Sequence, residues 1–147
     1  DGIKQLENQR KKNSEAYALL ALLQSFSVQF TSGMVAGIVS LKVVDNDNAF
    51  LSLLKKDEVL NIPVAHHDGN YYIDSLGLKD LEENGQILLK YCDNNGSVVN
   101  MNGSVSNIAG ICNKEKNVFG LMPHPERAIE ELLGSTDGIN MLKGFLQ

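Results

Sequence analysis

Short apolar stretches separated by polar turns run along the chain from residue 34 to residue 122. Such stretches, bounded by Asn, Asp and Gly, are typical of β-strands. The Asp68-Gly69 pair is a turn signal and is expected to join the second predicted strand to the third. The pattern predicts strands at 34–44, 58–65, 71–74, 86–92, 104–112 and 117–122.

Other parts of the chain have helical spacing. Helices are predicted at 49–55, 76–83, 125–133 and 137–146, with Ser75 as the N-cap of the second. Residues 1–24 also read as a polar-to-apolar helix, and any domain boundary would fall near 24–33, where β-like sequence begins. We expect one domain over residues 1–147, with a helical segment of unassigned role at 1–25. The fold class is α/β, a mixed sheet with flanking helices.

Composition limits the kind of protein. With 147 residues, 43% hydrophobic and 21% charged, the chain can bury one ordinary core. Its formal charge of −5 argues against a nucleic-acid partner, because phosphate binding depends on clustered Lys and Arg. Nothing in these residues resembles a signal peptide or an apolar stretch of membrane length, so we expect a cytoplasmic protein without a membrane partner.

The two cysteines, Cys92 and Cys112, lack the CxxC spacing of a metal site. Neither lies in a glycine-flanked strand-to-helix turn that would expose a nucleophile. We expect both to be buried structural thiols, and a disulfide is not expected in a reducing compartment.

Candidate chemistry lies in the segment 121–128, where prolines flank His124 and Glu126 follows two residues later. A residue before proline is pushed toward extended backbone, in which side chains at i and i+2 point the same way. Glu126 can then hold one ring nitrogen of His124, leaving the other free as a general base. The same tripeptide also suits a plain strand-to-helix junction, in which Glu126 only complements the helix N-terminus.

Four groups of residues, in this order, resemble one family. They are 62–72, which contains Ala65-His66-His67-Asp68-Gly69; 102–104 with 107–113; 120–128, which contains Pro123-His124-Pro125-Glu126; and 133–138, Leu-Gly-Ser-Thr-Asp-Gly. The chain resembles the PurQ-type glutaminase subunits of phosphoribosylformylglycinamidine synthase, which are class I glutamine amidotransferases with a flavodoxin-like fold. The resemblance covers about residues 46–147.

The resemblance implies a subunit that hydrolyses glutamine and passes ammonia to a synthetase partner, which converts formylglycinamide ribonucleotide to its amidine in purine synthesis. It assigns His124 as the catalytic base and Glu126 as the carboxylate that orients it. The implied partners are the large synthetase subunit and its small accessory subunit. No cofactor is expected in this chain, and ATP and Mg are expected on the synthetase.

This sequence departs from the family pattern in its N-terminal part. The family carries its cysteine nucleophile in a Gly-x-Cys-x-Gly turn, and residues 1–147 contain none, so we expect an incomplete glutaminase domain. Two functions stay open. The chain is either a glutaminase whose nucleophile comes from another segment or chain, or a non-catalytic remnant that binds the synthetase partner.

His66 and His67 raise the question of a metal site. Adjacent strand residues point to opposite faces, so at most one of the pair could join His124, and we expect no metal. His66 matches the family's histidine in this stretch and is a candidate for contact with the substrate or partner. His67 is expected to be solvated.

Overall fold

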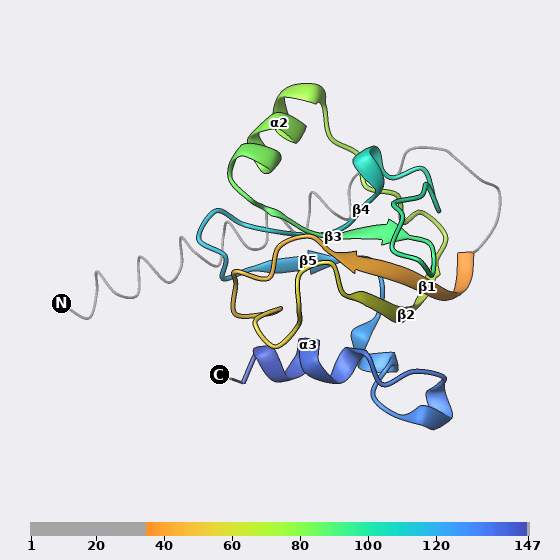
Figure 1. Cartoon of the computed structure of the whole chain (residues 1–147). Coiled ribbons are helices and arrows are strands. Elements are labelled where there is room, and N and C mark those ends of the chain that lie inside the picture. The colour runs from red at the N-terminus through yellow and green to blue at the C-terminus, as the bar shows by residue number, and fades with distance from the viewer. Residues whose placement is uncertain (1–34, 147) are drawn as a thin grey trace, which may run out of the picture.

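A five-stranded antiparallel sheet is the centre of the computed structural model, which describes residues 35–146 (Figure 1). The strand order is β2-β1-β3-β4-β5, and each neighbouring pair is antiparallel. The strands are β1 (Val35–Val43), β2 (Val59–His66), β3 (Ile87–Cys92), β4 (Ile108–Cys112) and β5 (Phe119–Leu121). The helical segment predicted at 1–25 lies outside the described residues.

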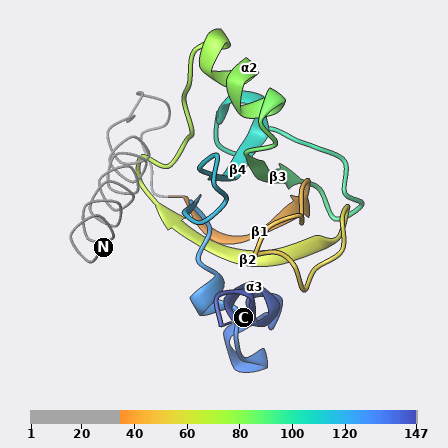
Figure 2. The same ribbon diagram turned by 90° about the vertical axis from the view of Figure 1, so that its left-hand side faces the viewer.

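Two α-helices and three short 3-10 helices accompany the sheet. Helix α2 (Ser75–Glu83) and helix α3 (Gly138–Gly144) lie on opposite sides of the sheet (Figures 1 and 2). The 3-10 helices are η1 (Val105–Asn107), η2 (Pro125–Arg127) and η3 (Glu131–Leu133). The predicted α/β class is confirmed, and within residues 35–146 the expected mixed sheet has only antiparallel pairs.

The core has two layers, one on each side of the curled sheet. The larger layer joins β1, β2 and β3 to the 50–54 segment and to Met141 of α3. The smaller layer joins Leu81 of α2 to Ile87, Ile108 and Ile111. Strand β3 is central and contacts both layers, so its sequence ILLKYC is almost continuously apolar.

Strand β2 forms one edge of the sheet and shows the alternating burial of a strand with one covered face. Its outer backbone groups are bonded to later parts of the chain. Asn61 donates its N–H to Asp137 Oδ2 at 2.7 Å, and the Pro63 carbonyl accepts from the His124 N–H at 2.7 Å. The edge of β2 therefore holds both the start of α3 and the start of η2.

Several predicted elements differ from the structure because side chains compete for the backbone. Residues 49–55 do not form a helix. The Leu54 carbonyl accepts from Asn46 Nδ2 at 2.8 Å, and the Lys55 N–H donates to Glu58 Oε2 at 2.7 Å in place of a helical carbonyl. Residues 71–74 form no strand, and Tyr71 bonds instead to Ser104 and Val105 through its backbone.

The helical predictions also need correction. The N-cap of α2 is Asp74, whose Oδ1 accepts from the Gly77 N–H at 2.7 Å, and not Ser75. The helix predicted at 125–133 is two separate 3-10 turns, η2 and η3, while α3 is shorter than the predicted 137–146. None of the helices within residues 35–146 is long and apolar enough to cross a membrane.

Candidate functional site

The side chains of His124 and Glu126 meet, as the sequence predicts. His124 Nδ1 lies 2.8 Å from Glu126 Oε1. The His124 backbone, at φ −107° and ψ 86°, is outside the helical region, and Pro125 then begins η2. The Arg127 Nε is 3.8 Å from the same carboxylate oxygen. The proline-flanked segment thus brings an imidazole and a carboxylate together.

This geometry has a chemical consequence for the imidazole. When Nδ1 carries the proton and donates it to Glu126, Nε2 is left unprotonated and can accept a proton from a reacting group. The side chain of His124 is 32% exposed and that of Glu126 is 56% exposed, so a ligand can reach the pair. The carboxylate contacts the ring directly, which a helix-end role alone would not require.

Two elements position this pair. The His124 N–H donates to the Pro63 carbonyl of β2, and the Gly138 N–H at the start of α3 donates to the Ala128 carbonyl at 2.9 Å. A Cβ added to Gly138 would lie 2.0 Å from the Pro125 carbonyl oxygen. Only glycine allows α3 to approach η2 this closely, and the turn is held between β2 and α3.

The adjacent histidines at the end of β2 have different environments, as predicted from strand geometry. His67 is exposed, and its Nδ1 lies 3.2 Å from Asp68 Oδ2. His66 is half-buried at the end of β2, where its Nε2 lies 3.5 Å from Asn102 Nδ2. Burial lowers the pKa of His66, and the nearby His124 lowers it further, while Asp68 acts in the opposite direction. His66 and His124 therefore share one region of the structure.

Metal-ligating side chains do not gather in this region. No group of three or more His, Cys, Asp or Glu side chains that could hold a metal ion occurs within residues 35–146.

Both cysteines of the chain are buried, at the ends of β3 and β4. Burial raises the pKa of the Cys112 thiol to about 11, and burial together with Asp93 raises the pKa of the Cys92 thiol. Because the thiolate is the nucleophilic form, neither cysteine is suited to attack a substrate. This confirms their prediction as structural thiols.

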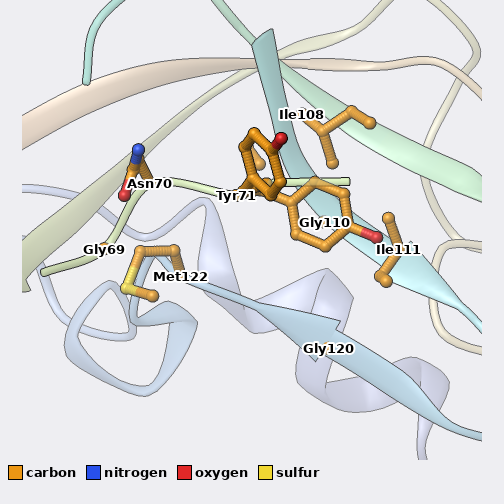
Figure 3. A pocket seen from close by; sticks show the side chains of 10 residues that line it. Gly69, Asn70, Tyr71, Ile108, Gly110, Ile111, Gly120 and Met122 are labelled. Carbon is orange, nitrogen blue, oxygen red and sulfur yellow. The ribbon is translucent and has the colours of Figure 1, made fainter. Parts of the chain in front are cut away.

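A small apolar pocket lies beside the site, between the 69–72 loop and β4 (Figure 3). Gly69 and Met122 are at one end of it and Ile108 and Ile111 at the other (Figure 3). Gly69 packs against the His66 ring, and Met122 is two residues before His124. One end of the pocket therefore lies next to His66, and neither histidine lines it.

Sequence reasoning from chemistry alone missed Asn102 and Gly138 as parts of this region. Both belong to motifs that carry the family resemblance, at 102–104 and 133–138, but neither has a reactive side chain. Their place in those motifs was the only sequence feature that could have pointed to them. Their contacts with His66 and Pro125 are seen only in the structure.

Comparisons with known proteins give a family. The family model of the CobB/CobQ-like glutamine amidotransferase domain matches residues 6–138. A phosphoribosylformylglycinamidine synthase subunit PurQ of Sulfurimonas denitrificans is 55% identical over 142 residues, which cover 88% of this chain and 63% of that protein. The PurQ subunit of Aquifex aeolicus is 55% identical over 129 residues, which cover 86% of this chain and 55% of that protein.

A solved structure is also similar. A chain in the structure of PurLQS from Thermotoga maritima is 38% identical, with a TM-score of 0.66, over 81% of this chain and 50% of that chain. This chain thus spans between about half and two-thirds of the length of the proteins that it matches.

Proposed function

The chain belongs to the family of CobB/CobQ-like glutamine amidotransferase domains, and we propose that it carries the base and orienting carboxylate of a glutaminase subunit of phosphoribosylformylglycinamidine synthase. The observation that carries this proposal is the 2.8 Å contact between His124 Nδ1 and Glu126 Oε1. That contact lies in the segment where the family resemblance assigns the two residues.

In the proposed reaction a cysteine thiolate attacks the side-chain amide carbon of glutamine. The carbon–nitrogen bond breaks, and His124 gives a proton to the departing ammonia. Water, deprotonated by His124, then attacks the thioester and releases glutamate and the thiolate. Glu126 holds the imidazole and stabilises its charged form, and His66 is a candidate for contact with glutamine.

The nucleophile in this scheme comes from a polypeptide segment other than these 147 residues. Cys92 and Cys112 are both buried, and their thiol pKa values are raised. The ammonia goes to a synthetase subunit that uses ATP and Mg to form the amidine, with a small accessory subunit in the same complex. We propose that this reaction takes place in the cytoplasm.

A second function is favoured by the same two buried cysteines. A chain that has the fold but no reactive thiol would act as a binding module for the synthetase subunit. The two functions differ in one measurable property, because only the first supplies ammonia from glutamine.

The test compares glutamine-dependent with ammonia-dependent synthesis by the complex that contains this chain. His124→Ala should lower the glutamine-dependent rate about 10²-fold to 10⁴-fold, because a general base is lost, and should leave the ammonia-dependent rate unchanged. His67→Ala is the matched control, since His67 is exposed and paired only with Asp68 among the contacts seen.

A His124→Ala complex that hydrolyses glutamine at the normal rate would refute the assignment of the base. A wild-type complex that uses only ammonia, in which the chain still binds the synthetase, would instead support the binding module.

A further inference from the structure

Asn102 has no role in the function proposed above, yet its side chain joins several parts of the structure. Its Nδ2 lies 3.1 Å from the Gly69 carbonyl, 3.3 Å from the Tyr91 hydroxyl and 3.5 Å from His66 Nε2. Its Oδ1 accepts from the Ser104 N–H at 3.2 Å and from the Ser104 hydroxyl at 2.7 Å. The amide therefore links β2, β3 and the loop before η1.

The orientation of this amide is fixed by two backbone groups that have only one role each. The Ser104 N–H can only donate, so it requires Oδ1, and the Gly69 carbonyl can only accept, so it requires Nδ2. A flipped amide would set donor against donor at Ser104 and acceptor against acceptor at Gly69. The NH₂ group of Asn102 consequently faces His66.

This orientation determines the form of the His66 ring. The two N–H groups of Asn102 have nearer acceptors in the Gly69 carbonyl and the Tyr91 hydroxyl, so the 3.5 Å contact with His66 Nε2 is the weakest of the three. A proton on Nε2 would still face an N–H donor there, so the neutral ring carries its proton on Nδ1. Nδ1 is buried and has no hydrogen-bond partner among residues 35–146. It lies against Gly69, where an added Cβ would come within 2.4 Å of it. The neutral ring therefore leaves one N–H without an acceptor among these residues, and an imidazolium would leave two.

The charged groups around His66 act on it from two sides. His124, just before η2, opposes a charge on His66, and Asp68, in the loop after β2, favours one. Burial adds to the effect of His124, and together they outweigh Asp68, because the pKa of His66 is lowered. The electrostatic surroundings and the hydrogen bonds thus favour the same neutral form.

We propose that Asn102 is a positioning residue that holds His66 neutral, with its proton on Nδ1, beside His124. A neutral neighbour allows His124 to take up a proton without a second cation next to it. That consequence rests on the proposed function, in which His124 is the base, but the protonation state of His66 does not.

The first test is nuclear magnetic resonance of the imidazole nitrogens in the ¹⁵N-labelled chain. The chain has three histidines, so His67→Ala and His124→Ala identify the signals of His66. We expect a single Nδ1–H tautomer for His66 at pH 7.5 and a titration midpoint below the ordinary value of about 6.5. An Nε2–H tautomer, or a midpoint above that value, would overturn the proposal without any variant at Asn102.

The second test changes the group that faces Nε2. Asn102→Asp replaces the donor with a carboxylate that accepts a hydrogen bond from a protonated Nε2, and should raise the His66 midpoint by about one pH unit or more. Asn100→Asp is the matched control, because it adds the same charge two residues away and can still accept the Gly103 N–H, as Asn100 Oδ1 does at 2.7 Å. Equal midpoints in the two variants would refute a special role for Asn102.

The two proposals fail separately. Loss of the proposed glutaminase role, shown by a wild-type complex that uses only ammonia, would leave the tautomer and midpoint of His66 as predicted. An active complex in which His66 is the Nε2–H tautomer would refute only the role of Asn102.

Discussion

The thiols of Cys92 and Cys112 show how burial decides reactivity at a single residue. Both side chains are almost completely inaccessible, with residue exposures of 1% and 0%. We predict that neither reacts with Ellman's reagent in the native chain at pH 8, because the thiolate is disfavoured and the reagent cannot reach the sulfur. Both should react after denaturation in guanidinium. Rapid labelling of either thiol in the native chain would contradict the buried sites described here.

Glu126 contributes both orientation and charge to His124. Glu126→Gln keeps an oxygen that can accept a hydrogen bond from Nδ1–H, but it removes the negative charge that stabilises the imidazolium. We expect the glutamine-dependent rate of the complex to fall about tenfold or more, with a change in its pH profile. Arg127→Ala is a suitable comparison, since Arg127 contacts the same carboxylate only at 3.8 Å. An unchanged rate and pH profile in Glu126→Gln would refute the orienting role.

At the scale of elements, α3 holds the site through a backbone contact. The Gly138 N–H donates to the Ala128 carbonyl, and Asp137 bonds to β2. The first contact depends on the close approach of Gly138 to the Pro125 backbone of η2. The start of the helix therefore fixes the position of the turn that carries His124 and Glu126.

Gly138→Ala tests this contact between α3 and η2. The new Cβ would meet the Pro125 backbone, which cannot rotate away as a side chain can, so we expect a loss of about 1–3 kcal/mol in the free energy of unfolding. Asn140→Ala, at an exposed position of the same helix, should change it by less than about 0.5 kcal/mol. Urea denaturation measures both. A Gly138→Ala chain as stable as the wild type would show that the approach is not tight.

Some elements could be predicted from the sequence and others could not. Strand β2 and helix α2 could be predicted because each has one side against the core, and β1 because it is rich in Val and Ile. The turns at 49–55 could not be foreseen, since helical spacing does not reveal the bonds of Asn46 and Glu58 to the backbone of this segment. The meeting of His124 and Glu126 was predictable because it needs only local geometry, whereas the contact of Asn102 with His66 joins residues far apart in sequence.

At the scale of the whole molecule, His66 makes stability depend on pH. Its pKa is lowered in the folded chain, so between the unfolded value of about 6.5 and the lower folded value the unfolded chain binds more protons. The free energy of unfolding should therefore fall as the pH falls through this window. We expect the wild type to lose more stability between pH 7.5 and pH 5 than His66→Gln does, measured by urea denaturation at each pH. A parallel loss in both would contradict a neutral His66.

The bonds that join His124 and Asp137 to β2 also disfavour association of this edge strand with a second copy of the chain. An open edge strand can pair with another chain and begin aggregation, and natural proteins block such edges with proline and with covering segments. Here Pro63 lies in the edge strand, and the His124 N–H and the Asp137 carboxylate occupy backbone groups that a foreign strand would use. A change that loosens the His124 turn would then lower the solubility of the chain and also disturb the contact between His124 and Glu126. The segment that carries these two residues therefore also opposes self-association.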